Sequence, residues 1–318
     1  MAQGQISGTS NRQLSRLSDQ VARVVFLACA ILLILVIVSV IIFIGSNAFR
    51  IFFADGAQGT SFKEFFTVSN WDPTGNNGNP AYGAAGLILG SVVITLLSVI
   101  ITAPLAFGLA LYFTEAAPRW LATLLQPLIE IFTGMPSVVI GFLGLVILVP
   151  FLQKVTASLT GGLQLGGYGW GAATLVLIIM ILPTVISVSI DALRAVPGSV
   201  REASLALGST RWQTMSKAIL PAAGPGLATA IVLGMARAIG ETLAVALVLG
   251  GDQLPKDIFT PRVFFQPNVN ITYKIVQDFG EVSGAARDAY WTLAFILLVI
   301  SFLFICVSRY LASRSVYR

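Results

Sequence analysis

The sequence predicts an all-α protein that crosses a membrane about six times. Hydrophobic residues make up 56% of the 318 residues and charged residues only 10%, whereas a soluble domain carries about a quarter charged residues. The mean hydropathy is +0.87. Several apolar stretches reach the length of about 20 residues that a helix needs to cross the hydrocarbon core. These observations indicate one polytopic membrane domain over residues 24–311.

The expected spans follow one another with polar segments between them. The first span, residues 24–45, is too long for a signal-peptide core and is not followed by a small-residue cleavage site, so we expect it to be a retained membrane anchor. Residues 1–23 are polar and are expected to be a poorly ordered tail, and residues 312–318 form a second tail. The six spans are predicted at residues 24–45, 86–113, 121–152, 171–190, 222–250 and 289–308.

The distribution of basic residues predicts the orientation. With the N-terminus inside, eleven Lys and Arg residues lie on the inner side and seven on the outer side, where the loops are longer. The positive-inside rule therefore places both termini and the loop 191–221 in the cytoplasm. The loops 46–85 and 251–288 would then lie on the outer side of the membrane.

Several functional classes lack the residues that they need. The chain has no histidine, and Cys29 and Cys306 both lie in apolar segments, so neither a metal site nor a nucleophile–base pair is expected. No stretch has the spacing of a Walker A loop. No basic face with interleaved aromatic residues indicates nucleic-acid binding. We expect no cofactor and no catalysis in this chain, and any ATP–Mg to be bound by a separate subunit.

Arg237 and Glu241 are charged residues inside an otherwise apolar span. Arg at the centre of a membrane helix costs about 2.5–3.5 kcal/mol on insertion scales, so such residues face a bundle interior or an aqueous path. On one helix the two residues would be neighbours and could form an ion pair. Arg237 could capture a tetrahedral oxyanion with two hydrogen bonds, and Glu241 could compete for the arginine and weaken retention. A structural alternative is a self-neutralising pair that only locks helix packing.

A second candidate anion site lies in the third apolar region. Pro136 lacks a backbone N–H and predicts either a kinked helix or two half-helices there. A helix restarting at Ser137 would present free N–H groups to an anion, with Glu130 one turn before the break. Thr133 and Ser137 could line this site, although such side chains more often bond back to their own helix.

The loop 191–221 reads as two short helices with a glycine corner between them. Ser199 and Glu202 have the spacing of a capping box, Gly208 is a natural helix stop, and Thr210 begins a second start signal that ends at Gln213. Local capping alone would explain Glu202 and Gly208.

The segment Glu202-Ala203-Ser204-Leu-Ala-Leu-Gly208 resembles the EAA motif of the permease subunits of ABC importers. In that family the loop docks into the ATPase subunit, so the resemblance implies a type I (MetI-like) fold. It also implies coupling roles for Glu202, Ala203, Ser204 and Gly208. Ser204 stands where the family has a second alanine.

A second resemblance concerns the substrate. The segment from Gly234 to Val245, which contains Arg237, Glu241 and Thr242, is similar to one shared by the phosphate permeases PstC and PstA, and other segments look more like PstC. This implies a heterodimer with a PstA-type permease, a PstB-type ATPase dimer and a PstS-type phosphate-binding protein. The same resemblance implies a prokaryotic inner membrane, with the loops 46–85 and 251–288 on the periplasmic side. It also implies a substrate path that includes Arg237, Glu241 and Thr242. The open alternatives are a permease for sulfate or molybdate, a membrane docking or signalling protein without transport and, less favoured, a secondary transporter.

Overall fold

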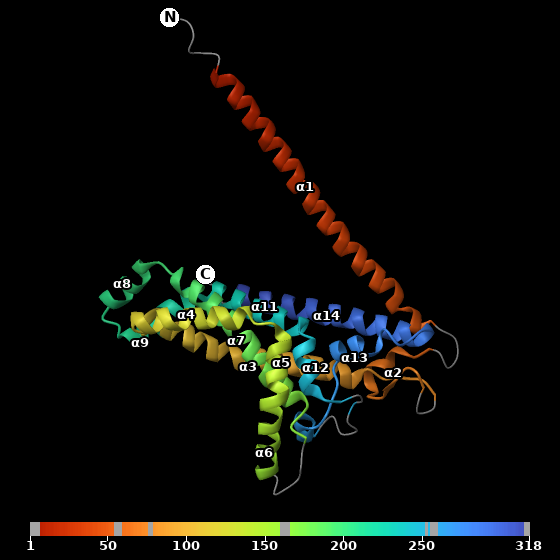
Figure 1. The fold of residues 1–318 in the computed structure, drawn as a ribbon. Helices are drawn as coiled ribbons and strands as arrows, with labels where there is room; N and C mark the ends of the chain where they lie inside the picture. Colours follow the sequence, from red (N-terminus) through yellow and green to blue (C-terminus); the bar gives the residue numbers. More distant parts are fainter. Residues whose placement is uncertain are drawn as a thin grey trace, which may run out of the picture.

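The structure is a computed structural model, and it describes residues 7–53, 59–75, 79–159, 166–251, 254 and 260–314. Most of these residues are helical (Figure 1). Five helices are long and apolar enough to cross a membrane, or six spans are present if one bent helix pair is counted as a span. The prediction of an all-α membrane protein with about six spans is therefore confirmed.

Four of the six predicted spans are single long helices. They are α1 (Ser7–Ala48), α3 (Ala85–Glu115), α7 (Trp170–Arg194) and α14 (Gly284–Arg314). Residues 7–23 of the expected tail are helical, because α1 begins at Ser7. Elongating a helix from an existing apolar segment needs no new nucleus, and the polar residues after Gly8 include neither glycine nor proline.

The third apolar region is two helices that meet at Pro136. α4 (Arg119–Gly134) ends there, and α5 (Ser137–Leu143) continues through the π-helical η3 (Gly144–Leu148) into α6 (Val149–Leu159). Met135 is extended, with φ −67° and ψ 136°, as expected for a residue before proline. The expected break is confirmed, but the apolar span runs over Ser137–Ser158 and not from residue 121.

The fifth predicted span, 222–250, is also broken. α8 (Gly198–Ala206), α9 (Arg211–Thr214), η4 (Met215–Ile219) and α10 (Leu220–Ala222) lead into α11 (Gly224–Gly240), with a bend of 67° before α11. α11 ends at Gly240, and α12 (Leu243–Leu249) starts after an extended Glu241. A continuous helix over 222–250 is therefore wrong.

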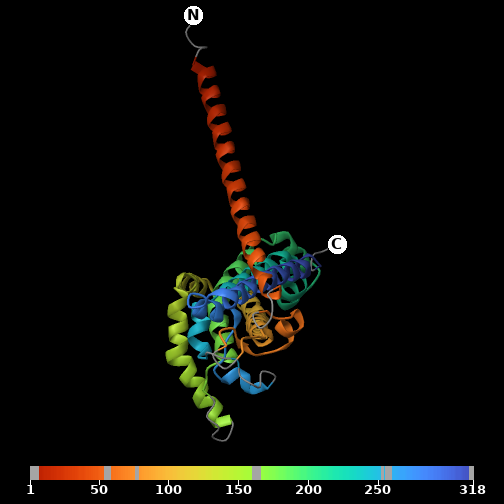
Figure 2. The ribbon, with the colours of Figure 1, turned by 90° about the vertical axis from the view of Figure 1, so that its right-hand side faces the viewer.

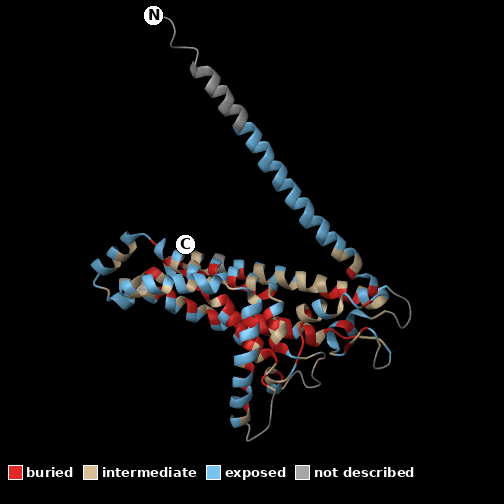
Figure 3. Ribbon diagram, viewed as in Figure 1, coloured by how far each residue is buried: buried red, intermediate tan, exposed pale blue. Residues whose placement is uncertain are grey.

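The helices α3, α7 and α11 form the centre of the bundle, where the buried residues concentrate (Figure 3). α5 and α6 run across the direction of these helices (Figure 1). α5 packs closely on α12, since a Cβ built on Gly141 would lie 2.5 Å from the Cα of Ala244. Both short helices at the two breaks are therefore held against each other.

α1 leaves the bundle and points away from it in both ribbon views (Figure 2). None of its membrane-crossing window is buried within the chain. Its C-terminal end is attached to α14, where the Thr292 hydroxyl donates to the Ala48 carbonyl at 2.6 Å and Phe43 packs edge-on against Trp291. In a membrane, lipid or another protein chain covers the rest of this helix.

The two predicted outer loops pack together as a second core. The elements of this core are η1 (Arg50–Phe52), α2 (Phe62–Thr67), β1 (Trp71–Asp72), β2 (Ala81–Tyr82) and α13 (Ile271–Asp278), whereas η5 (Pro261–Phe265) packs against α7 in the main core. β1 pairs antiparallel with β2. The buried Tyr290 hydroxyl donates to Asp278 at 2.6 Å and accepts from the Trp71 indole at 3.3 Å, which ties the two loops to α14. Burial raises the pKa of the Tyr82 phenol at the edge of this core.

Candidate functional site

Arg237 lies in the last turn of α11 and joins three helices. It is half-buried. One guanidinium nitrogen, Nη1, donates to the Thr184 hydroxyl of α7 at 2.8 Å, and Nη2 lies 3.5 Å from the Thr133 carbonyl at the end of α4. Both acceptors are neutral, so the positive charge of Arg237 is not compensated by these contacts. A half-buried arginine of this kind is suited to binding an anion.

Glu241 does not pair with Arg237 in the described part of the chain, and the predicted ion pair is therefore wrong. The i, i+4 geometry is lost because α11 ends at Gly240 and Glu241 is extended, with φ −78° and ψ 130°. The Glu241 carboxylate instead accepts a hydrogen bond from the backbone N–H of Ala244 at 3.1 Å. An anion at a helix start is favourable because it satisfies a free N–H group and complements the helix dipole. Glu241 therefore caps α12.

This contact makes a prediction for Glu241. Glu241→Ala removes the cap and is expected to lower stability by about 0.5–2 kcal/mol, whereas Glu241→Gln keeps an acceptor oxygen and most of that stability. Thermal unfolding of the purified complex in detergent measures the difference. Equal losses in the two variants would show that the charge matters and the cap does not.

The other residues predicted for the site at the Pro136 break differ in whether they contact Arg237. The Thr133 hydroxyl bonds back to the Ile129 carbonyl at 2.8 Å, as expected for a helical threonine, and only its backbone reaches Arg237. Glu130 is exposed and accepts from Gln126 at 3.2 Å. Ser137 begins α5 and is half-buried. Within the described residues, neither Glu130 nor Ser137 is bonded to Arg237.

Thr242 occupies the position before α12, but its side chain makes no capping hydrogen bond. Thr184, by contrast, contacts Arg237 directly and was not among the residues that the sequence indicated. The available signal was Pro183, which stands beside it inside the fourth span. A proline in a membrane helix frees a backbone carbonyl and often accompanies a polar site.

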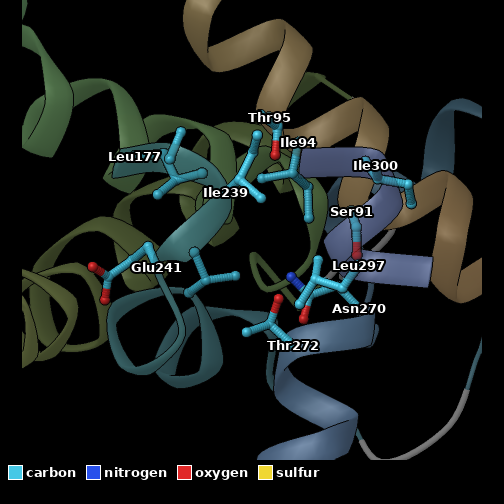
Figure 4. Close-up of a pocket in the computed structure, with 12 residues that line it drawn as sticks. Ser91, Ile94, Thr95, Leu177, Ile239, Glu241, Asn270, Thr272, Leu297 and Ile300 are labelled. Carbon is cyan, nitrogen blue, oxygen red and sulfur yellow. The ribbon is translucent and has the colours of Figure 1, made fainter. Parts of the chain in front are cut away.

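A small cavity lined by both polar and apolar side chains lies beside the α11–α12 break (Figure 4). The Thr95, Asn270 and Thr272 side chains point their polar atoms into it, and the Glu241 carboxylate points away from them. About 10 Å³ is open to a water-sized molecule, which is room for roughly one water. This cavity is too small for a tetrahedral oxyanion, so we place the candidate anion site at Arg237.

The predicted capping box at Ser199 and Glu202 is wrong. α8 begins at Gly198 after Pro197, no side chain caps it, and Ser199 therefore lies inside the helix. Glu202 is exposed and has no capping role. The second start signal is confirmed, because Thr210 and Gln213 form a reciprocal capping box. Gly208 is confirmed as the stop, with a left-handed φ of +78° that glycine adopts without steric cost.

The loop 191–221 is anchored to the bundle but leaves apolar residues exposed. Arg201 of α8 forms an ion pair with Glu115 at the end of α3, with Nε 3.1 Å from Oε2. The Ser204 and Thr214 hydroxyls are bonded at 3.1 Å, while Ala203 is exposed. Leu207 is 88% exposed and Trp212 is 67% exposed. An anchored loop with exposed large apolar side chains is suited to docking another protein.

Broken membrane helices around a half-buried arginine, together with an anchored and exposed loop, fit a membrane permease subunit. The model of the family described as "Binding-protein-dependent transport system inner membrane component" matches residues 103–317. The chain belongs to this family. It is therefore a multi-pass inner-membrane permease component.

Individual relatives agree with this assignment, and solved structures agree with the fold. The chain is 43% identical over 311 residues to the probable ABC transporter permease protein YqgH of Bacillus subtilis, covering 97% of this chain and 94% of that protein. It is 35% identical over 267 residues to the phosphate transport system permease protein PstC of Pasteurella multocida, covering 80% and 82%. In fold it is similar to a chain of the bacterial alginate ABC transporter, with a TM-score of 0.63, 15% identity and coverage of 95% and 96%. The MetNI methionine ABC transporter gives a TM-score of 0.52 at 20% identity, covering 74% and 95%.

Proposed function

We propose that the chain is the PstC-type permease subunit of an ATP-driven importer of inorganic phosphate. The observation that carries the proposal is the half-buried Arg237, whose two hydrogen-bond partners are neutral. Phosphate would supply the missing negative charge, and a guanidinium can bind two of its oxygens at once. The names of the PstC relatives support phosphate as the substrate.

The partners follow from the same proposal. A PstA-type permease would form the other half of the path, and a PstS-type protein would deliver phosphate to the outer loops 46–85 and 251–288. A PstB-type ATPase dimer would bind ATP–Mg and contact the segment from Glu202 to Gly208 on the cytoplasmic side, where both termini would also lie. Because Arg201 joins α8 to Glu115 of α3, movement of the loop would be transmitted directly to the bundle.

Phosphate would pass Arg237 near the Pro136 break and between the two permeases. The Thr133 carbonyl would hold Arg237 in position, and Ser137 would line the path at the start of α5. Glu130 and Thr242 would line the approaches. Glu241 would shape the path by capping α12, rather than by competing for Arg237 as the sequence suggested.

Uptake of radiolabelled phosphate tests this function in cells that depend on this importer, with sulfate and molybdate as competitors. We expect uptake that excess sulfate and molybdate leave unchanged. Inhibition by sulfate or molybdate at a concentration comparable to that of phosphate would instead indicate a permease for another oxyanion. Absence of uptake by an assembled complex would favour a docking or signalling role for the loop 191–221.

A further inference from the structure

We propose that Thr184 is a second anion ligand on this chain, acting beside Arg237. This inference rests on the proposed phosphate import. Its starting point is the hydrogen bond of 2.8 Å in which Arg237 Nη1 donates to the Thr184 hydroxyl oxygen. In that bond the threonine is the acceptor, so its own hydrogen remains available.

The hydrogen of Thr184 has no acceptor among the described residues, which distinguishes it from most helical hydroxyls of this chain. Hydroxyls in membrane helices usually donate to the carbonyl of the preceding turn. Ser98 donates to Ile94 at 2.7 Å, Ser189 to Val185 at 2.6 Å and Thr133 to Ile129 at 2.8 Å. Thr184 makes no such bond. Because its oxygen is held by a cation, its O–H is also a stronger donor than that of a free threonine.

The position of Thr184 allows contact with a substrate. Thr184 and Arg237 are both half-buried, and the neighbouring Thr133 and Pro136 are exposed. The anion site on this chain is thus a face at the end of α4, open to a second subunit. A tetrahedral anion bound to the guanidinium there would lie within reach of the Thr184 hydroxyl, which would donate to one of its oxygens.

This arrangement also provides a way to hold Arg237 when no anion is bound. Without substrate, the guanidinium is kept in place by the Thr184 oxygen and the Thr133 carbonyl. Neutral acceptors hold it more weakly than a carboxylate does. An arriving phosphate would therefore not have to displace a strong competing anion.

The test compares Thr184→Val with Thr184→Ser in phosphate uptake by the intact importer. Valine has nearly the same shape but no hydroxyl, so we expect the KM for phosphate to rise about ten-fold, as for the loss of one hydrogen bond to a charged group, with less change in the maximal rate. Serine should restore the KM. Thr174→Val is the matched control, because Thr174 lies on the same helix with a buried hydroxyl that has no partner among the residues that the structure describes, and the KM of this variant should be unchanged.

Two results would overturn the assignment: a KM for Thr184→Val within two-fold of wild type, or a serine variant as impaired as the valine variant. Neither result affects phosphate uptake by the wild type, so the proposed function would stand. A second comparison separates a ligand from a residue that only holds Arg237. In an Arg237→Lys background no guanidinium is present to be held, so Thr184→Val should still raise the KM if Thr184 contacts phosphate. Loss of the effect in that background would make Thr184 a positioning residue only. If the lysine variant transports nothing, binding of labelled phosphate to the purified lysine and lysine–valine complexes takes the place of uptake, and weaker binding by the double variant supports Thr184 as a ligand while equal binding makes it a positioning residue only.

Discussion

Arg237→Gln is expected to reduce phosphate uptake at least one hundred-fold in a complex that still assembles. Each hydrogen bond to a charged group contributes about 1.5–3 kcal/mol, and the substitution removes both the charge and the paired donors. The fold should tolerate the change, because the two acceptors that Arg237 leaves, the Thr184 hydroxyl and the Thr133 carbonyl, are neutral, and neither residue is fully buried within the chain. Initial rates of radiolabelled phosphate uptake at matched membrane expression measure the effect.

Arg237→Lys is the control for this prediction. Lysine keeps the charge but not the planar pair of donors, so uptake should be intermediate and its KM raised. Undiminished uptake in Arg237→Gln would reduce the arginine to a link between α4, α7 and α11. We would then place the anion site elsewhere at the Pro136 break.

Leu207→Asp is expected to abolish uptake while the permease itself remains folded. Leu207 is 88% exposed at the corner between α8 and α9, so the substitution disturbs no packing within the chain. In an apolar contact with an ATPase subunit, however, the buried carboxylate would be costly. Copurification of the ATPase with the permease, together with uptake, measures the loss of docking.

Leu207→Met keeps an apolar side chain of similar volume and should retain uptake and copurification. If Leu207→Asp still carries the ATPase and transports phosphate normally, the exposed corner is not part of the contact. The docking surface would then have to be sought on Glu202 and Ala203, which are also exposed.

The long spans could be predicted because apolar length alone determines them, as for α3 and α7. The break at Pro136 was also predictable, since proline removes a hydrogen bond wherever it occurs. The break at Glu241 was not, because no proline marks it and the polar pair Glu241 and Thr242 is a short interruption between two long apolar runs. α12 is set at its angle by close backbone packing of Ala244 on Gly141, which is a tertiary contact.

In the candidate site, too, some features could be predicted from the sequence and others could not. Arg237 could be identified because a charge in an apolar span is costly wherever it lies. Its pairing with Glu241 was wrong because it depended on an unbroken helix, and Thr184 was missed because one threonine in an apolar span carries little signal. The capping box at Ser199 failed for a local reason, since Pro197 and Gly198 start the helix two residues earlier than the pattern requires.

The contrast between α1 and α11 has a consequence for biogenesis. α1 has a mean hydropathy of 3.5 in its apolar window and no buried surface there, so it can leave the translocation machinery for lipid without any other helix. α11 carries Arg237, whose solitary insertion is unfavourable by about 2.5–3.5 kcal/mol. The groups that accept its hydrogen bonds, Thr184 and the Thr133 carbonyl, belong to α7 and α4, which are synthesised earlier. The hydrogen-bond acceptors of Arg237 can therefore already be in the bilayer when Arg237 emerges from the ribosome.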